Sequence, residues 1–493
     1  MKNKLFAAVL GLAIMFSCSK PEPEPLVYMI DTDIEAVELG PDKLTASIHV
    51  LTDAEDWTYM ESVSWLDFEK DGEYLKLTVN SANTTGKDRV AQIQLFTVPF
   101  RPEVSATVQV TQLPENGGSS GDGEGDFSDP AFWNLVSGYD ADGDGTLSAS
   151  EALRIVELDL DFDDEIVGAE PIKSLQGIRL CKNLKTLYCE FNAISELDLS
   201  GLDKLEYLAC GYNLIESINL EGCTALKQLY FNVNEISRLD LSDCSSLQFL
   251  QGYKNNLTSF SISGSESIRY VQLDQNELAS FSARNCQNLG TINVGSNNLH
   301  ELVLENLPAL HTLGCYRNAL SELDVRAFVK LEMLECYQNN LTSLNLDGLS
   351  SLVWIRCDDN LISELDISSC TKLVSLNLAS NQLSGELDLG RYAALETLDC
   401  SGNYISSLKF SSSNTSLKTL GCSSMSLGIL DTSFLSALEQ LDCHRNVIKE
   451  LDLSGNSAIK RVDCTENPLA RLLLPASAEV ELSVDNPDIV ERI

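Results

Sequence analysis

Apolar residues and a single polar residue recur at a fixed spacing through the second half of the chain. Asparagine occurs at ten consecutive positions 21 residues apart, of which the first is Asn192 and the last is Asn381, and it returns at Asn403, Asn446 and Asn467. Leucines keep a constant distance from each asparagine. A unit of this length is too short to enclose a core, so neighbouring units must stack and bury their leucines against one another. The pattern therefore predicts a solenoid that is mainly β-structure.

The repeated positions form the frame of a leucine-rich repeat, L-x-x-L-x-C-x-x-N-x-[LI]-x-x-L-x-L. The first complete copy contains Leu184, Leu187, Cys189, Asn192, Ile194, Leu197 and Leu199. We count about 14 units and place the solenoid at residues 181–475, before a C-terminal tail at residues 476–493. The short unit leaves little room for a convex helix. It resembles the internalin-like bacterial class, which implies extended or turn-like backs.

The asparagines are expected to be structural. Buried amides at this position should bond the turning backbone of neighbouring coils. Met425 replaces one asparagine, so it predicts a weaker rung, with a tolerated defect as the alternative. An extra residue around Gly385 lengthens one unit from 21 to 22 residues.

Residues 26–114 have a different pattern, in which apolar and polar residues alternate in short runs. Alternation with a period of two predicts an antiparallel β-sandwich. Trp57, Ser64, Trp65, Leu66, Asn80, Arg89, Ala91, Ile93, Val110, Thr111 and Gln112 resemble a BACON domain, an immunoglobulin-like module of Bacteroidetes surface proteins. The resemblance implies a spacer, or a domain that contacts carbohydrate or mucin. We expect Trp57 and Trp65 to be core residues rather than glycan platforms, because a small sandwich needs such anchors.

A flexible linker and a short helical cap are predicted between the sandwich and the solenoid. Residues 115–126 are rich in glycine, serine and acidic residues, which is typical of a flexible linker. In residues 127–180 we expect a helical cap and a lead-in coil, with Asp129 and Pro130 as a helix N-cap and first turn. The segment resembles the N-terminal caps of Bacteroidetes leucine-rich-repeat lipoproteins.

The cap contains a complete EF-hand-like loop. Oxygen ligands for a hard cation stand at loop positions 1, 3, 5, 7, 9 and 12, namely Asp140, Asp142, Asp144, Thr146, Ser148 and Glu151. Gly145 permits the sharp turn. The spacing predicts a structural Ca2+ ion, with a metal-free acidic turn as the alternative. Because there is a single loop, a structural clamp is favoured over a calcium sensor.

The first 25 residues predict export and anchoring. Lys2 and Lys4 precede an apolar run at residues 5–16, which is too short to span a bilayer as a mature helix. Residues 1–17 resemble a bacterial lipoprotein signal peptide, in which Cys18 becomes lipidated, and residues 18–25 resemble the acidic tether of Bacteroidetes surface lipoproteins. This implies an outer-membrane, lipid-anchored protein facing the cell exterior, with membrane contact only through the lipid. The alternative is an ordinary cleaved signal.

The net charge limits the possible binding partners, and the placement of the cysteines indicates whether they form disulfides. Acidic residues outnumber basic ones 73 to 34, and binding nucleic acid requires phosphate neutralisation, so no nucleic-acid partner is expected. Nine of the 15 cysteines share one column of the repeat, where plain hydrophobic residues substitute in other units. Stacked strands hold such side chains roughly 4.8 Å apart and parallel, which does not suit a relaxed disulfide. We expect buried free thiols.

The outward positions of the strands predict an interaction face. In the first nine units they carry Tyr188, Tyr207, Tyr230, Phe249, Tyr253, Tyr270, Tyr316, Tyr337 and Trp354. In the last five units they are small or polar, so we expect that part to extend the array rather than to bind. Exposed aromatic rows are typical of interaction surfaces. The alternative is cross-strand stacking that stabilises the sheet.

No catalytic constellation is found in the sequence. The four histidines are scattered, and glycine-rich phosphate loops are absent. The chain is therefore interpreted as a non-enzymatic surface lipoprotein that binds extracellular protein or glycan, and mediates adhesion, through the aromatic strand face. The alternative is a polysaccharide-capture component of a carbohydrate-uptake system.

Overall fold

The computed structural model describes residues 30–32, 36–39, 45–52, 54, 56–60, 66–80, 89–98, 105–112, 127–162 and 170–493. The chain divides into two compact units, residues 1–122 and 123–493, and the boundary falls within the predicted linker. The predicted signal peptide, Cys18, the tether, Trp65 and the linker lie outside the described residues. Among the residues that are described, no helix has the length and apolar character needed to cross a membrane.

The first unit contains two four-stranded sheets. One sheet has the order β1 (Ile30–Thr32), β3 (Thr45–Thr52), β6 (Tyr74–Val79) and β5 (Leu66–Asp71). The other has the order β2 (Ala36–Leu39), β8 (Ser105–Gln112), β7 (Arg89–Val98) and β4 (Asp56–Met60). Both sheets contribute to one buried apolar cluster, in which Leu77 and Ile93 come from different sheets. Trp57 is 4% exposed and belongs to this cluster, as expected for a core anchor.

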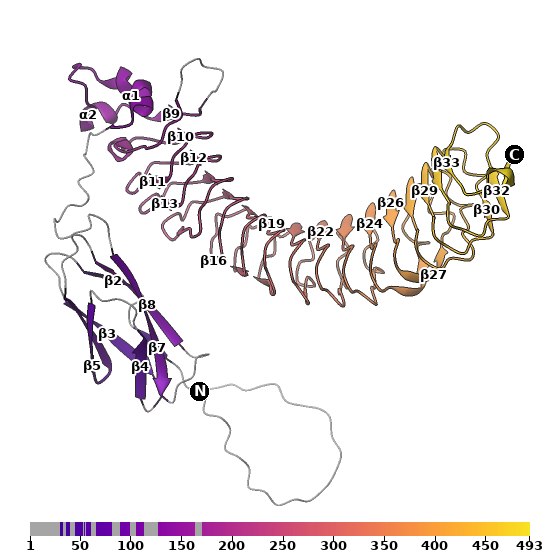
Figure 1. Cartoon of the computed structure of the whole chain (residues 1–493), viewed down its shortest axis with the longest axis horizontal. Coiled ribbons are helices and arrows are strands. Elements are labelled where there is room, and N and C mark those ends of the chain that lie inside the picture. Colours follow the sequence, from indigo (N-terminus) through magenta and orange to yellow (C-terminus); the bar gives the residue numbers. More distant parts are fainter. Residues whose placement is uncertain are drawn as a thin grey trace, which may run out of the picture. The chain divides into compact units, whose positions relative to one another are not determined.

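The second unit is built on a parallel sheet of 16 strands, one from each coil, that lines the inner side of the curved solenoid (Figure 1). Its strands are β9 (Glu157–Asp159), β10 (Thr186–Tyr188), β12 (Tyr207–Ala209), β14 (Gln228–Tyr230), β15 (Phe249–Gln251), β17 (Tyr270–Gln272), β19 (Thr291–Asn293), β21 (Thr312–Gly314), β22 (Met333–Glu335), β23 (Trp354–Arg356), β24 (Ser375–Asn377), β26 (Thr397–Asp399), β28 (Thr419–Gly421), β29 (Gln440–Asp442), β31 (Arg461–Asp463) and β33 (Glu481–Ser483). Each strand pairs in register with the strand of the next coil, so equivalent residues form straight columns across the sheet.

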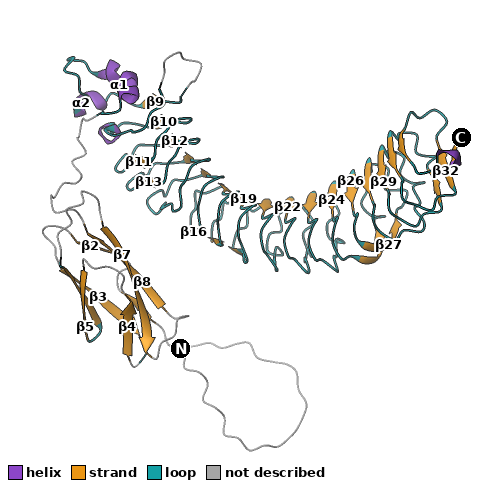
Figure 2. Ribbon diagram, viewed as in Figure 1, coloured by secondary structure: helices purple, strands orange, loops and turns teal. Residues whose placement is uncertain are grey.

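The outer side of the solenoid consists of turns and short strands (Figure 2). These strands form four small parallel sheets: β11 (Glu196–Asp198) with β13 (Ser217–Asn219); β16 (Ser259–Ser263), β18 (Ser280–Arg284) and β20 (Val303–Glu305); β25 (Ser384–Asp388) with β27 (Tyr404–Lys409); and β30 (Glu450–Asp452), β32 (Arg471–Leu474) and β34 (Val490–Arg492). Within residues 181–493 the only helical segment is a 3-10 turn at Pro487–Ile489. The expectation of extended or turn-like backs is confirmed.

The sheet extends beyond the predicted solenoid at both ends. The predicted units correspond to β10 to β31, but β9 lies within the predicted cap and pairs in parallel with β10. Residues 476–493, which we named a tail, contribute a further coil, because β33 pairs with β31 and β34 pairs with β32. These outer coils lack the full leucine and asparagine frame, so the repeat pattern does not reveal them.

Two short helices precede the first coil. Helix α1 (Pro130–Val136) has Asp129 as its N-cap, and a 3-10 turn at Ser137–Tyr139 follows it. Helix α2 (Ala149–Ala152) begins with a capping box between Ser148 and Glu151. Phe132 and Val136 of α1 are buried in the same apolar cluster as the leucines of the repeat. The helical cap and the solenoid therefore share one core.

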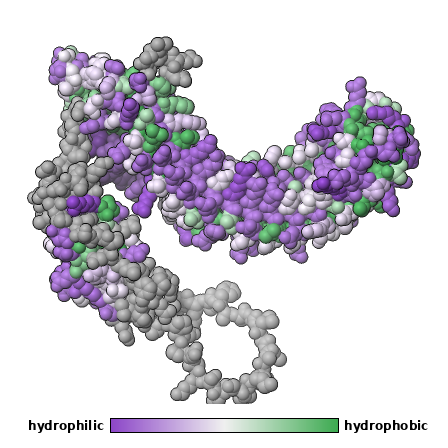
Figure 3. Space-filling model, viewed as in Figure 1, coloured by the Kyte–Doolittle hydropathy of each residue, from purple (hydrophilic) through white to green (hydrophobic). Residues whose placement is uncertain are grey.

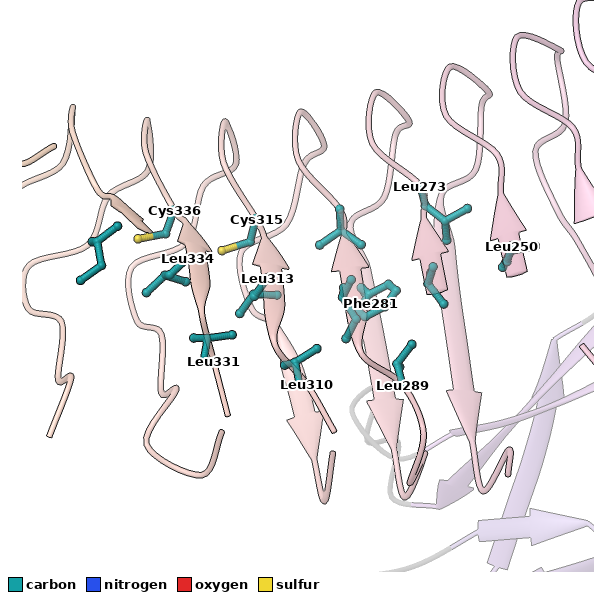
Figure 4. Packing of buried hydrophobic residues seen from close by; sticks show 14 of the residues in the cluster. Leu250, Leu273, Phe281, Leu289, Leu310, Leu313, Cys315, Leu331, Leu334 and Cys336 are labelled. Atoms are coloured by element: carbon teal, nitrogen blue, oxygen red, sulfur yellow. The ribbon is translucent and has the colours of Figure 1, made fainter. Parts of the chain in front are cut away.

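The leucines and cysteines of successive coils fill that core. Figure 4 shows Leu310, Leu313, Leu331 and Leu334 of neighbouring coils pointing into the same interior, with Cys315 and Cys336 side by side. All 14 cysteines in the described part of the chain are free and buried. Burial raises the pKa of Cys315 and of Cys357 to about 12, so their thiolates are scarce at neutral pH. The prediction of buried free thiols is confirmed for these residues.

The asparagine ladder joins each coil to the one before it. Asn339 Nδ2 donates to the carbonyl oxygen of Cys315 in the preceding coil and to that of Cys336 in its own coil, both at 3.1 Å. Its Oδ1 accepts a hydrogen bond from Leu320 N in the preceding coil at 3.0 Å. The first rung bonds the lead-in segment, because Asn192 Nδ2 donates to Leu160 O at 2.7 Å. The expected role of the asparagines is confirmed.

The two irregular units have local structural consequences. Met425 is buried at the rung position and has no amide to bond the preceding coil. The extra residue around Gly385 produces a register shift between Gly385 and Glu386 where β25 pairs with β27. Gly385 has φ of +83°, which a residue with a side chain rarely adopts. The longer unit therefore bulges on the outer side of the solenoid and leaves the inner sheet in register.

Because of these hydrogen bonds, removing the side-chain amide of one ladder asparagine should markedly lower the stability of the solenoid. Asn339→Ala leaves the Leu320 N–H and three carbonyl groups without side-chain partners, so the free energy of unfolding should fall by roughly 2–4 kcal/mol. Urea unfolding followed by circular dichroism measures this change. The adjacent Asn340→Ala is the matched control, because Asn340 is exposed. Equal losses in the two variants would contradict the role assigned to the ladder.

Candidate binding face

Three outward columns of side chains cover the inner sheet. On β10, for example, the half-buried Thr186 and Tyr188 flank the buried Leu187, which shows the alternation of a half-buried strand. Of the nine predicted aromatic residues, Tyr188, Tyr207, Tyr230, Phe249, Tyr270 and Trp354 lie on strands of this sheet. Tyr253, Tyr316 and Tyr337 lie two residues after the ends of β15, β21 and β22. All nine positions therefore lie along one face of the solenoid.

The aromatic side chains form separate groups rather than one continuous row. Tyr207 lies between Tyr188 and Tyr230, with ring centroids 5.0 Å and 5.4 Å away. Phe249 and Tyr270 are 6.3 Å apart. These contacts are the cross-strand stacking that the alternative interpretation predicted, and they leave the rings half-buried.

A second aromatic group contains an arginine. The rings of Tyr316 and Tyr337 stack at 4.8 Å with an interplanar angle of 1°. The guanidinium of Arg356 lies 3.8 Å from the centre of the Tyr337 ring, and its Nε donates to Asp358 Oδ1 at 2.9 Å. Trp354, one strand beyond, is 42% exposed and is the most exposed of the nine. This group presents the most accessible aromatic surface on the face.

Glycines make room for the largest outward side chains. A Cβ atom at Gly295 would lie 2.4 Å from Cζ of Tyr316, and one at Gly211 would lie 2.7 Å from Oε1 of Glu190. The Tyr316 ring therefore lies directly against the backbone of the preceding coil. Any larger residue at Gly295 would displace this ring and disrupt its stack with Tyr337.

Two carboxyl groups lie beside the first aromatic group. Asp161 Oδ1 accepts a hydrogen bond from Glu190 N at 2.6 Å. Partial burial raises the pKa of both carboxyls, and the charge of Asp161 raises that of Glu190 further. Burial also raises the pKa of the adjacent Tyr207 to about 12, with contributions from Tyr230 and Tyr188. Sequence reasoning missed this pair, because Asp161 precedes the first complete repeat.

A groove lies over the strands that carry small outward residues. It has a volume of about 490 Å³, and Ser375, Thr397 and Gly421 belong to its lining. Trp354 and Arg356 line one end, and the strands that carry Asp442 and Asp463 line the other. We expected the last five units only to extend the array. The small side chains there instead leave a hollow between larger ones.

Three of the six predicted calcium ligands, Asp140, Asp142 and Asp144, lie together in the loop between α1 and α2. Carboxylate oxygens of Asp140, Asp142 and Asp144 lie within 4.8 Å of one another, which fits a hard cation. Glu151 bonds the loop itself, since Oε1 accepts from Ala141 N at 2.7 Å and Oε2 from Ser148 N at 2.9 Å. These bonds, with one from the Ser148 hydroxyl, lower the pKa of Glu151 to about 2.

Thr146 and Ser148, the remaining two predicted ligands, and Asp129 form further hydrogen bonds within the cap. Thr146 N and Oγ1 both donate to Asp144 Oδ1, and Ser148 Oγ donates to Glu151 Oε2 at 2.7 Å. Asp129 has a second role that the sequence does not indicate: its Oδ2 accepts from Lys173 N at 2.8 Å and from Ser174 N at 3.1 Å. Burial opposes ionisation of Asp129, but four backbone donors hold its pKa below the usual range. The start of α1 is thereby fastened to the lead-in coil.

Comparison with solved structures identifies the architecture. The functional domain of InlJ from Listeria monocytogenes, which includes a cysteine ladder, is 24% identical with a TM-score of 0.56, over 71% of this chain and 81% of that one. An internalin (inlF) from the same organism is 25% identical with a TM-score of 0.52, over 64% and 94%. YopM, a leucine-rich effector protein from Yersinia pestis, is 22% identical with a TM-score of 0.55, over 72% and 99%.

The chain folds as a leucine-rich-repeat solenoid. No protein-family model matches its sequence, and a search of curated proteins also finds no match. The similarity to the solved structures therefore concerns the fold of the solenoid. The features of its inner face have to be interpreted from the residues of this chain.

The carboxyl pair at the start of the solenoid gives a prediction with a defined sign. A raised pKa in the folded state means that ionisation of Glu190 costs stability once the pH exceeds its unfolded value of about 4.3. Glu190→Gln should therefore raise the melting temperature by roughly 1–2 °C at pH 7, and the gain should vanish below about pH 4. Thermal melts across this pH range, with the exposed Glu216→Gln as control, measure the effect. A lower melting temperature for Glu190→Gln at pH 7 would refute this assignment.

Proposed function

We propose that this chain is a non-enzymatic cell-surface lipoprotein that mediates adhesion, and that its aromatic strand face binds an extracellular protein. The observation that carries the proposal is the alignment of nine aromatic residues along one face of the inner sheet. Tyrosine, tryptophan and arginine dominate the binding energy of protein interfaces. Tyr337, Trp354 and Arg356 combine all three types within two neighbouring coils.

The hydropathy of the solenoid surface supports binding at a limited patch rather than over the whole surface. Figure 3 shows a mostly hydrophilic solenoid on the visible side, with apolar residues in scattered patches. Rings that stack on each other are held in fixed positions, so little conformational entropy is lost when a partner covers them. Stacking within the face and binding through it are therefore compatible roles for the same residues.

Location at the outer membrane is part of the proposal. The basic start, the short apolar run and Cys18 support export and lipidation, and the acidic tether supports display on the cell exterior. A net charge of −39 favours solubility at such a surface and disfavours nucleic-acid partners. The two-sheet unit at the N-terminus would act as a BACON-like spacer between the anchor and the solenoid.

A second candidate function is polysaccharide capture for carbohydrate uptake. It is favoured by the groove, whose lining includes the exposed Trp354 together with hydroxyl and amide groups such as those of Thr397 and Asn377. Such a combination can stack on a sugar ring and bond its hydroxyl groups. An array of neutral glycans separates this function from protein binding.

A structural calcium ion in the cap is a further part of the proposal. Asp140, Asp142 and Asp144 would hold it, with Thr146, Ser148 and Glu151 completing the EF-hand-like set. The ion would neutralise three converging carboxylates. Because α1 and α2 share the core of the first coils, an ordered loop would stabilise the covered end of the solenoid.

The aromatic face is tested by removing one ring from each of three places along it. Changing Tyr230, Tyr253 and Tyr337 together to serine should abolish binding in a pull-down of extracellular proteins, because each substitution removes aromatic contact area. Tyr404→Ser is the matched control, since Tyr404 is 71% exposed and lies on the outer-side strand β27. Retained binding by the triple variant would reject the face as the binding site.

The calcium site is tested by chelation. Removing Ca2+ with EGTA should lower the thermal midpoint of the cap and first coils in the natural protein, and Asp140→Ala should lose this calcium dependence. Comparing melts with and without chelator within each variant separates the ion from other effects of the substitution. The exposed Asp203→Asn serves as control. An unchanged midpoint after chelation of the natural protein would exclude a stabilising ion.

A further inference from the structure

Three side chains with metal-binding groups meet near the C-terminal end of the inner sheet. Asp442 on β29 and Asp463 on β31 are direct partners in the parallel register. His444 follows Asp442 by two residues, and its ring lies on the same side of the sheet. One carboxylate oxygen of each aspartate and one ring nitrogen of His444 all lie within 4.8 Å of one another.

The charges of this cluster are not balanced by the residues around it. Two aspartates opposite each other on neighbouring strands repel. Among the described residues, His444 is the only base within ion-pair distance of either one, with Nδ1 2.7 Å from Asp442 Oδ1. Asp463 Oδ1 accepts hydrogen bonds from Thr465 N at 3.1 Å and from Thr465 Oγ1 at 2.7 Å, which leaves its charge in place. A bound cation would remove the repulsion.

The side chains of the site are accessible to solvent, and the backbone already holds them close together. The side chains of His444 and Asp442 are 29% and 48% exposed. Both aspartates stand on paired strands of the inner sheet, so the cluster needs no rearrangement of the backbone to hold an ion. Asp442 and Asp463 also line the 490 Å³ groove, which points independently to a ligand at this end of the face.

On the described solenoid face, a histidine beside two aspartates occurs at one place. At the two matching positions of the preceding coil the chain has Gly421 and Ser423, and one coil earlier it has Asp399 and Ser401. Only the coil of β29 adds a histidine to the aspartate column. One imidazole nitrogen with two carboxylate oxygens suits zinc and other first-row divalent ions better than calcium, which prefers oxygen ligands alone.

We propose that Asp442, His444 and Asp463 form a binding site for a first-row divalent transition-metal ion. Three protein ligands leave coordination positions that face the groove, where water or a donor group of a groove ligand would complete the shell. The site shares the groove with Trp354 but includes none of the nine residues of the aromatic strand face and none of the cap loop, so it can be tested independently of the proposed protein binding.

The direct test is zinc binding measured by calorimetry. ZnCl2 is titrated into the secreted chain without an affinity tag, after chelator treatment and with calcium at saturation to occupy the cap loop. The natural protein should bind one zinc ion at this site, and His444→Gln and Asp463→Asn should each weaken binding at least tenfold. Asp399→Asn is the matched control, because Asp399 belongs to the same column and groove but lies outside the cluster.

A second measurement covers the case in which one variant unfolds. Co2+ should give a visible absorption band without a sulfur charge-transfer band, since the cysteines are buried. Asp442→Asn should remove this band while its circular dichroism spectrum and melting temperature remain close to those of the natural protein. Absence of zinc heat and of the cobalt band in the natural protein would overturn the proposal. So would unchanged binding in His444→Gln, or an equal loss in Asp399→Asn.

Discussion

The side-chain amide of the ladder asparagine is the interaction on which the solenoid depends. Each coil must turn sharply after its strand, and the turn leaves backbone groups of two coils facing the interior. Asn339 bonds four of them from one side chain. The residue before each ladder asparagine adopts a left-handed backbone, as Val233 does at φ of 58°, and this costs conformational energy in every coil. The amide bonds offset that cost and fix the turn, so the strands that follow start in register.

Because the strands are in register, equivalent residues form columns across the inner sheet. The residue types in the outward columns can then change from coil to coil. Most core positions hold small or medium apolar residues, and the larger Phe231 shows how tightly neighbouring coils are coupled. A Cβ at Gly252 would lie 1.9 Å from Cζ of Phe231, so the larger ring fills the space of the missing side chain in the next coil. The outward columns have no such restriction. Aromatic groups, a carboxyl pair and a hollow of small residues therefore occur on one regular scaffold.

Much of this structure follows from the sequence because repetition places equivalent residues at equivalent points. Leu187, Cys189 and Asn192 could be assigned to core and ladder before any coordinate was known, and so could the outward position of Tyr188. What escaped prediction depends on contacts between distant or irregular segments. The bond from Asp129 to Lys173 spans 44 residues without a pattern, and the coil containing β33 has lost the repeat frame. The closeness of Asp442 and Asp463 could have been read from their 21-residue spacing, had the polar columns been compared as the aromatic ones were.

The terminal strands β9 and β33 have a consequence for association between molecules. A parallel sheet that ends in an open strand offers backbone groups to a further strand, and identical coils invite identical chains to add to the stack. Here the terminal strands carry Glu157 and Asp159 at one end and Glu481 at the other. Placing two copies end to end would bring carboxylates against carboxylates. The acidic ends therefore disfavour end-to-end stacking of this repetitive chain.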